Sequence, residues 1–275
     1  MKRRSVKKAA LWLFMAALTL LFLAPFYFVV VNSVKDYNSI LSKTASLPVE
    51  LHWENFTKAW NTVNFPRAFR NTLIATLGTV IPTIFIASMC AYRMVRHPSK
   101  TNRIIQAVFI ASMVIPVQAV MLPLVEELSW LRLVNTMPGL ILSYLGIGIA
   151  FSTFLYLGYM KSIPIEIEES AVIDGCTPYQ VYFKIVFPLL KPMTITVALL
   201  KTIWCWNEYM LALLILQKKE LRTLQLSINS LFDEYRQQWD IALPALLIAI
   251  IPTLIFFLLM QKRIIQGMVS GSVKG

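Results

Sequence analysis

The chain has 275 residues, of which 57% are hydrophobic and 15% are charged, and its mean hydropathy is +0.63. A soluble domain is far less apolar than this, so the composition predicts a protein of the lipid bilayer. The net charge of +12 comes from Lys and Arg residues that lie between long apolar runs rather than along one face of a soluble fold, which argues against a nucleic acid partner.

Six apolar runs are long enough to cross a bilayer as helices, because a spanning helix needs about 20 residues. They cover residues 9–31, 72–92, 104–128, 137–160, 193–216 and 241–260. The first run is longer than the apolar part of a cleaved signal peptide, so we expect it to remain as a spanning helix. The sequence therefore predicts an all-α membrane protein with six transmembrane helices.

The loops between these runs indicate an orientation. If the N-terminus is cytoplasmic, more Lys and Arg residues lie on the inner segments than on the outer ones, as is usual for membrane proteins. Six crossings then place both termini in the cytoplasm. Prolines inside the runs, including Pro82, Pro116 and Pro252, remove backbone donors and are expected to bend their helices.

The longest inner loop, residues 161–192, reads as two short helices rather than a simple connector. Pro164 suits a first helical position, and residues 165–173 can then form one helix. Gly175 is expected to end that helix, because glycine readily adopts the left-handed backbone found at helix C-termini.

A second short helix is predicted directly after this glycine. Thr177 can cap it with Pro178 at its first position, and Pro188 is expected to stop it. Four side chains within it are spaced as one apolar stripe that needs a packing partner: Tyr179, Tyr182, Phe183 and Val186.

The same loop resembles the "EAA" motif of bacterial ABC importer permeases, written EAA-x3-G-x9-I-x-L-P. The matching positions are Glu169, Ala171, Gly175, Ile185 and Pro188. Ser170 and Phe187 stand where the motif has Ala and Leu. The segments 158–164 and 267–275 also resemble the carbohydrate-importer branch, in particular subunits similar to the maltose permease G protein.

This resemblance implies a type I ABC importer permease fold, in which a cytoplasmic coupling helix docks in a cleft of a separate ATPase. The residues implied in coupling are Glu169, Ser170, Ala171, Asp174, Gly175, Ile185 and Pro188. The implied partners are an ATPase dimer, a second homologous permease, an extracellular solute-binding protein and a sugar, in a bacterial plasma (inner) membrane among its lipids. The chain has no G-x4-G-K-[S/T] loop, so ATP and Mg are expected on the ATPase, with no cofactor on this chain.

The residues of the loop favour docking independently of the motif. Glu169 lies on the same side of its helix as Ile165 and Val172, which gives an apolar surface with one carboxylate. A loop resting on anionic lipid is the alternative, but its acidic residues disfavour it: Glu166, Glu168, Glu169 and Asp174. An acid/base pair is disfavoured because these carboxylates share one solvent-facing loop without a nucleophile or metal ligands.

Polar residues inside the fifth run are candidates for lining the transport pathway, since charge is costly in hydrocarbon. They are Lys201, Trp204, Asn207 and Glu208. Lys201 and Glu208 are two helical turns apart, too far to pair in a regular helix, so separate partners are expected. The tryptophans could stack on sugar rings, although aromatic residues of membrane helices more often serve as interfacial anchors.

We expect three parts in the chain. Residues 1–68 would hold the N-terminal tail, the first span and an outer loop, residues 69–265 the permease core with the coupling loop at 161–192, and residues 266–275 a cytoplasmic tail. The resemblance implies that Gly271, Val273, Lys274 and Gly275 of this tail contact the ATPase. The outer loops 32–70 and 217–240 could meet the binding protein.

Three other functions remain as alternatives. An importer for a non-sugar solute would share the coupling loop, whereas an ion-driven transporter should show paired broken helices in symmetric halves. A membrane enzyme should gather His or Asp residues at one face. The chain has two isolated histidines and three cysteines without metal-ligand spacing, so neither a catalytic site nor a metal site is expected.

Overall fold

The computed structural model describes the backbone of residues 2–232 and 238–272, and the side chains of residue 8, residues 11–232 and residues 238–259. All regular secondary structure in this part of the chain is helical. Packing divides the chain into two compact units: unit 1 comprises residues 1–65 and 227–252, and unit 2 comprises residues 66–226 and 253–275. The three parts expected from the sequence were defined by the expected side of the membrane and by the coupling motif, not by packing. That division stays a prediction.

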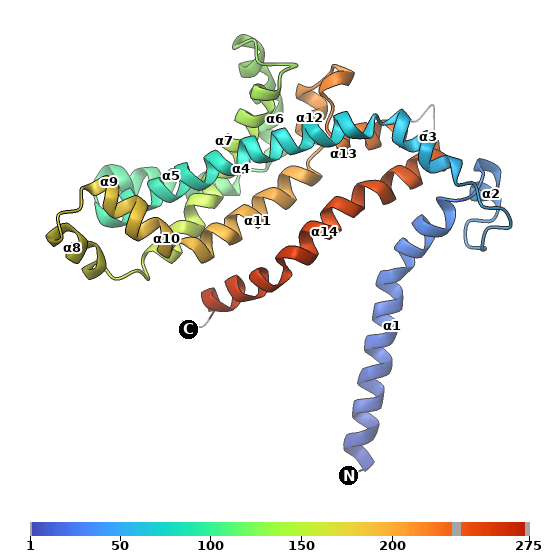
Figure 1. Ribbon diagram of the computed structural model, residues 1–275, viewed down its shortest axis with the longest axis horizontal. Coiled ribbons are helices and arrows are strands. Elements are labelled where there is room, and N and C mark those ends of the chain that lie inside the picture. The colour runs from blue at the N-terminus through green and yellow to red at the C-terminus, as the bar shows by residue number, and fades with distance from the viewer. Residues whose placement is uncertain (1, 233–237, 273–275) are drawn as a thin grey trace. The chain divides into compact units, whose positions relative to one another are not determined.

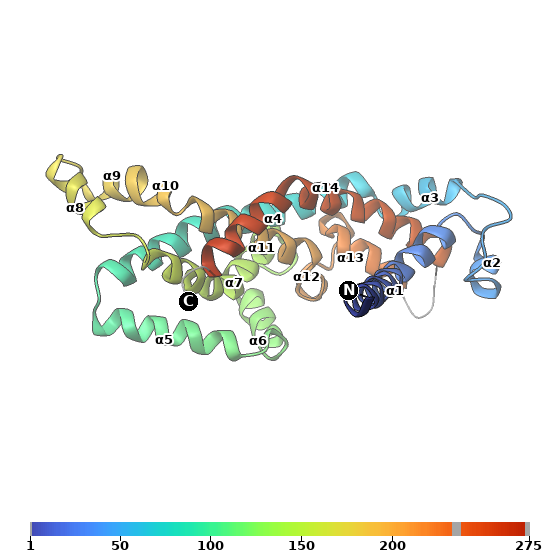
Figure 2. The ribbon, with the colours of Figure 1, turned by 90° about the horizontal axis from the view of Figure 1, so that it is seen from below.

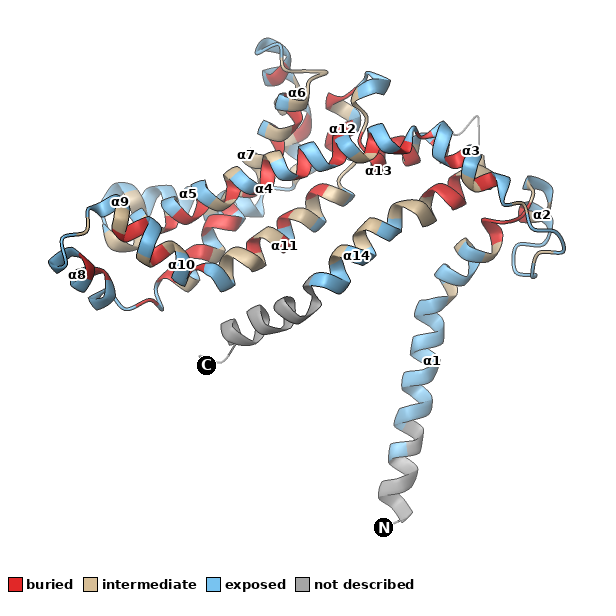
Figure 3. Ribbon diagram, viewed as in Figure 1, coloured by how far each residue is buried: buried red, intermediate tan, exposed pale blue. Residues whose placement is uncertain are grey.

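Unit 1 carries the first spanning helix and a short folded loop. Its elements are α1 (Lys2–Asn32), α2 (Tyr37–Ser42), α3 (Glu54–Thr62), η3 (Ser230–Phe232) and the first part of α14 (Trp239–Ser272), while α13 (Leu224–Asn229) crosses the division. The apolar stretch of α1 has only 6% of its residues buried, and Figure 3 shows most of its described length as exposed.

The loop after α1 is organised around Lys35, which is 2% exposed. Its ammonium donates to Asn32 Oδ1 and to the carbonyl of Lys43, both at 2.9 Å. The Asn55 amide donates to the carbonyl of Lys35 at 2.8 Å. Burial lowers the pKa of Lys35, because the charged form loses its hydration.

Unit 2 holds the predicted coupling loop and the other spans except α14, whose first part belongs to unit 1 (Figures 1 and 2). Its elements are α4 (Phe65–Arg96), α5 (Lys100–Val114), α6 (Val117–Trp130), α7 (Met137–Met160), α8 (Glu166–Ile173), α9 (Pro178–Gln180), the π-helix η1 (Val181–Val186), α10 (Phe187–Leu189), α11 (Lys191–Asn207), α12 (Met210–Ile215) and η2 (Lys219–Leu221).

Four helices of the described chain are long and apolar enough to cross a membrane, and two bent helix pairs raise this number to six if each pair is one span. The predicted span 104–128 is divided into two helices at Pro116, where the sequence predicted a bend. α5 and α6 are bent by 109°, because Ile115 before Pro116 takes an extended conformation with ψ of 121°. The predicted run 193–216 is also interrupted, between α11 and α12.

The buried side chains of unit 2 form two apolar clusters. The first, which we call the coupling cluster, joins α4, α7, α8, η1 and α11 through residues that include Ala91, Met160, Ala171 and Val186. The second, the α12 cluster, joins α6, α7, α11 and α12 through residues that include Leu128, Leu140 and Leu211. Each cluster surrounds one of the two sets of polar contacts described below.

Candidate functional site

The first short helix of the predicted coupling loop, α8, begins with acidic residues and ends at glycine. Glu166, Glu168 and Glu169 occupy its first turn, where carboxylates favour the positive end of the helix dipole. Pro164 precedes the helix rather than occupying its first position, because Ile165 is the N-cap. The boundary prediction was therefore wrong by two residues, a usual uncertainty at helix ends.

Gly175 ends α8 in a Schellman motif. Its φ is +85°, its N–H donates to the carbonyl of Val172, and the next N–H, of Cys176, donates to the carbonyl of Ala171, both at 3.0 Å. A Cβ built on Gly175 would meet nothing within 4 Å. Backbone conformation, rather than space, therefore requires glycine here.

Thr177 caps the next helix as predicted. Its hydroxyl accepts from the N–H of Gln180 at 3.4 Å, and the Gln180 side chain accepts from the N–H of Thr177 at 2.8 Å. This reciprocal pair is a capping box, and Pro178 takes one of the first helical positions.

Pro188 does not stop this helix, which corrects the sequence prediction. The helix changes to a π-helix over Val181–Val186, and continues through Phe187–Leu189 to a 72° bend before α11. A proline inside an α-helix leaves a carbonyl without its donor and clashes with the preceding turn. The wider π turn relieves that crowding and allows the chain to pass Pro188 without ending the helix.

The predicted apolar stripe divides between the core and the surface. Tyr182 and Val186 are buried in the coupling cluster, and the Tyr182 hydroxyl lies 2.7 Å from Ser88 Oγ of α4. Tyr179 and Phe183 remain 76% and 46% exposed. The wider π turn changes the spacing on which the stripe was predicted.

Glu168 fastens α8 to the end of α4, and the sequence prediction missed this contact. Its Oε1 lies 2.7 Å from Arg96 Nε, and its Oε2 accepts from the Tyr92 hydroxyl at 2.9 Å. Arg96 also donates to the carbonyl of Ile163 at 2.8 Å. The Glu168 side chain is 8% exposed, so the prediction that all four carboxylates of the loop face solvent was wrong.

Beside Glu168, other side chains of this segment are exposed. Ile165 and Val172 are 46% and 58% exposed, and Glu169 between them is exposed as well. Figure 3 shows most of the α8 ribbon in the colour of exposed residues. Of the other predicted coupling residues, Ser170, Asp174, Gly175 and Pro188 are exposed, Ile185 is partly buried and Ala171 is buried. Ile165 and Val172 therefore give α8 an exposed apolar surface that includes the Glu169 carboxylate.

The polar residues of the fifth run converge on Tyr144 of α7. Lys201 Nζ donates to the carbonyl of Tyr144 at 3.2 Å, and the Tyr144 hydroxyl donates to Glu208 Oε2 at 2.7 Å. Lys201 also lies 4.3 Å from the centre of the Trp204 ring. As expected, Lys201 and Glu208 bind separate groups, but each binds one group of the same residue, Tyr144. We call Tyr144, Lys201, Trp204 and Glu208 together the Tyr144 centre.

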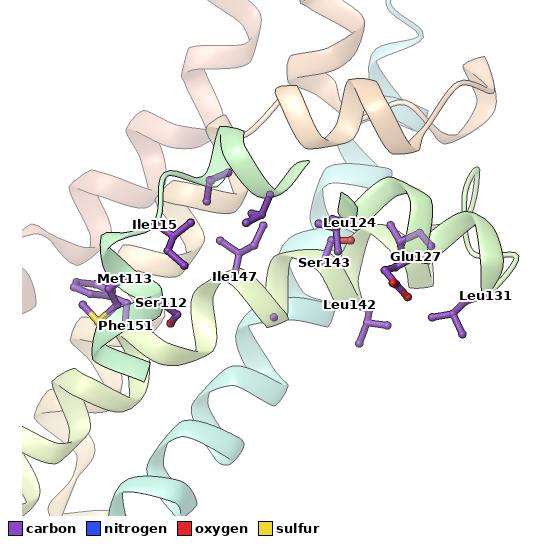
Figure 4. Close-up of a pocket in the computed structure, with 14 residues that line it drawn as sticks. Ser112, Met113, Ile115, Leu124, Glu127, Leu131, Leu142, Ser143, Ile147 and Phe151 are labelled. Atoms are coloured by element: carbon purple, nitrogen blue, oxygen red, sulfur yellow. The ribbon is translucent and has the colours of Figure 1, made fainter. Parts of the chain in front are cut away.

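Trp204 packs against another helix of unit 2, whereas the side chain of Asn207 is exposed. The Trp204 ring packs edge-on against Tyr144, with ring centres 5.1 Å apart, and Asn207 donates to the carbonyl of Ile203 at 2.8 Å within its own helix. Their role in lining a pathway stays a prediction. A cavity of about 580 Å³ lies among α5, α6 and α7, and its walls are apolar except near Ser112, Ser143 and Glu127 (Figure 4). None of the predicted pathway residues lines it.

The predicted tail contacts largely lie outside the described residues. Val273, Lys274 and Gly275 are not described, and Gly271 belongs to the part of α14 whose side chains are not described. Within the described residues, no group of three or more His, Cys, Asp or Glu is placed to hold a metal ion.

Comparison with known proteins gives consistent matches. Residues 83–270 match the family described as "Binding-protein-dependent transport system inner membrane component". The chain is 39% identical over 274 residues to AmyC of Thermoanaerobacterium thermosulfurigenes, a "Probable starch degradation products transport system permease protein", with 100% of both chains covered. It is 34% identical over 252 residues to the melibiose/raffinose/stachyose import permease protein MelC of Bacillus subtilis, with 91% of each covered.

The fold matches that of a chain in a crystal structure of "a bacterial ABC transporter involved in the import of the acidic polysaccharide alginate". The TM-score is 0.83 at 20% sequence identity, and the match covers 95% of this chain and 98% of that one. This agreement supports the all-helical membrane fold predicted from the sequence.

Proposed function

The chain belongs to the binding-protein-dependent transport system inner membrane component family, and from this premise we propose that it forms half of the translocation pathway of an ATP-driven sugar importer. It is a multi-pass inner membrane protein and a transport subunit rather than an enzyme. A second, homologous permease forms the other half of the pathway, and both termini face the cytoplasm.

The observation that carries this proposal is the exposed surface of α8 on a firmly attached segment. Ile165, Glu169 and Val172 are exposed beside one another, while the neighbouring Glu168 is buried and binds Arg96. An exposed apolar surface with a central carboxylate is suited to a cleft with a basic residue. We propose that this cleft belongs to an ATPase subunit, which also holds ATP and Mg.

The attachment of α8 supports a role in coupling. The coupling cluster joins α8 and η1 to three spanning helices, α4, α7 and α11. On the inner half of α7, the Tyr156 hydroxyl donates to Thr194 of α11 at 3.0 Å. A displacement of α8 by the ATPase would therefore move packed helices rather than a loose loop.

The substrate is proposed from relatives named for starch degradation products and for melibiose, raffinose and stachyose. These names support an oligosaccharide with α-linkages, delivered by an extracellular solute-binding protein. The outer segment 217–224 is a candidate surface for that protein, because it is held in place by hydrogen bonds. Asn135 Oδ1 accepts from the N–H of Gln217 at 2.6 Å, and Asn71 donates to the carbonyl of Glu220 at 2.8 Å.

Reversing one charge on α8 tests the docking. Glu169→Lys is expected to reduce co-purification of the ATPase and to lower ATP-dependent sugar uptake about tenfold or more, because a desolvated charge pair becomes a repulsion. Glu50→Lys, which reverses an exposed carboxylate outside the candidate spans, is the control and should assemble normally. Normal assembly and uptake with Glu169→Lys would exclude the proposed coupling surface.

A further inference from the structure

The fifth run is broken at two residues, and the break is held by side chains rather than left open. Glu208 ends α11 with an extended ψ of 127°, and Tyr209 follows with a φ of −130° before α12 begins at Met210. The Glu208 carboxylate then accepts from the N–H of Leu211 at 2.8 Å and from that of Ala212 at 3.3 Å. It therefore caps the N-terminus of α12 with a negative charge.

Tyr144 connects this cap to α7 and to α11. Its hydroxyl donates to Glu208 Oε2 at 2.7 Å, and its carbonyl accepts from Lys201 Nζ at 3.2 Å. Tyr144 is 0% exposed and Lys201 is 6% exposed, so water has little access to the bond between them, whereas Glu208 is partly exposed. Hydrogen bonds to charged groups under such conditions are among the stronger ones in proteins.

The position of Lys201 depends on a glycine. A Cβ built at Gly148, near the middle of α7, would collide with Lys201 Nζ. The lysine therefore lies against bare backbone of α7, with the Trp204 ring 4.3 Å away. Cation–π contact and the single carbonyl bond hold the ammonium beside Tyr144.

The far end of α12 is also anchored. The N–H of Asn135, just before α7, donates to the carbonyl of Ile215 at 2.8 Å, and Asn135 Oδ1 accepts from the N–H of Gln217 at 2.6 Å. Leu211, Ala212 and Ile215 are 0% exposed. α12 is thus a six-residue helix fixed at both ends to α7 and the turn before it.

We propose that Tyr144 is a positioning residue for transport: by binding Glu208 and Lys201 together, it fixes the direction in which α12 leaves α11. This inference rests on the proposed function, in which the ATPase moves the coupling loop (residues 161–192). α11 follows directly from that loop through the bend at Leu190. A movement of the coupling loop reaches the loop after α12 only if the break between α11 and α12 stays rigid.

Tyr144→Phe in the assembled, reconstituted complex tests this role. It removes one hydroxyl and keeps the ring against Trp204. We expect maximal uptake to fall about tenfold while ATP hydrolysis stays within about twofold, since one charged hydrogen bond is lost and docking of the ATPase is untouched. The sugar concentration at half-maximal uptake should stay the same, and more ATP should be hydrolysed for each sugar transported.

Three further variants separate positioning from general packing. Glu208→Ala removes this bond and also the cap of α12, so uptake should fall at least as far as with Tyr144→Phe. The double variant should be no worse than Glu208→Ala alone, because the Tyr144–Glu208 bond is already lost in that variant. Glu208→Gln keeps one acceptor oxygen and should give an intermediate uptake rate. Ser152→Ala is the control, since the buried Ser152 hydroxyl bonds only to Gly148 within α7 in the described structure.

The outcomes distinguish this inference from the proposed function. If the wild-type complex shows no ATP-dependent uptake, the proposed function fails first. If the wild-type complex transports sugar but Tyr144→Phe lowers uptake and ATP hydrolysis in equal proportion, or lowers neither, Tyr144 does not position the break. Additive losses in the double variant would also overturn the inference.

Discussion

Each of the two polar sites of unit 2 contains a tyrosine and a glutamate, but the two glutamates hold helices in different ways. In the coupling cluster, the Tyr92 hydroxyl donates to Glu168, and at the Tyr144 centre the Tyr144 hydroxyl donates to Glu208. Glu168 is neutralised by the guanidinium of Arg96, whereas Glu208 receives backbone N–H groups of α12. A side-chain ion pair joins two separate helices, whereas a helix cap fixes the start of one helix beside a break.

Because one glutamate is held by an ion pair and the other caps a helix, substitutions at the two sites should have different effects. Removing one member of a buried ion pair leaves a charge without a partner, which is costly wherever it occurs. Removing the Tyr144 hydroxyl leaves the backbone N–H donors of α12 bound to the Glu208 carboxylate. α12 should therefore stay helical, while the angle at which it leaves α11 is no longer fixed. We therefore expect large losses of assembly at Arg96 and losses of coupling without loss of assembly at Tyr144.

Arg96→Ala should produce the largest effect. It leaves the buried Glu168 carboxylate with the Tyr92 hydroxyl as its remaining described partner, and the complex should lose about 3–5 kcal/mol of stability. A thermal unfolding series on the purified complex measures this loss, and the yield of assembled complex should fall with it. Arg96→Met combined with Glu168→Leu should recover most of the stability, because no charge is then buried. A mild effect of Arg96→Ala would mean that this attachment is dispensable.

Gly148→Ala should have an intermediate effect at the other site. The added Cβ occupies the position of Lys201 Nζ, and displacing the lysine should cost about 1–3 kcal/mol. Gly146→Ala is a matched control on the same helix, where a Cβ would meet nothing within 4 Å. The control should be neutral or slightly stabilising, because alanine favours a helix over glycine. Equal shifts in melting temperature for the two variants would contradict the described packing of Lys201.

Gly175→Ala should have the smallest effect on stability and sharpens the comparison at the end of α8. An alanine at a φ of +85° should cost about 1–2 kcal/mol, because its Cβ crowds the backbone. Gly175→Asn should cost less, since asparagine tolerates this conformation. Both costs can be read from thermal unfolding, with uptake measured in parallel. If alanine and asparagine behave alike, backbone strain is not the reason for glycine at this position.

The parts of the coupling loop that could be predicted from the sequence depend on nearby residues. Gly175, Thr177 and Pro178 act on helix ends within a few positions of themselves, so their roles were readable. The π-helix before Pro188 was not, because it is a compromise between a missing donor and the packing of Tyr182 and Val186.

The polar contacts between helices could not be predicted from the sequence for a different reason. Glu168 lies 72 positions from Arg96, and Glu208 lies 64 positions from Tyr144. Spacing along one helix identifies candidates for pairing but gives no information about which other helix passes beside it. Tyr144 in particular looked like an ordinary residue of an apolar span, and only the packing of α7 against α11 shows that both charges meet it.

The caged Lys35 gives the chain a built-in marker for chemical labelling. Its amine is shielded, whereas Lys43 and Lys58 on the segment that follows α1 are exposed. A membrane-impermeant acylating reagent added to intact cells should therefore modify Lys43 and Lys58 and spare Lys35 if this segment faces outwards. Mass spectrometry of the labelled peptides would then report the sidedness of the first loop and the folded state of its lysine cage in a single measurement.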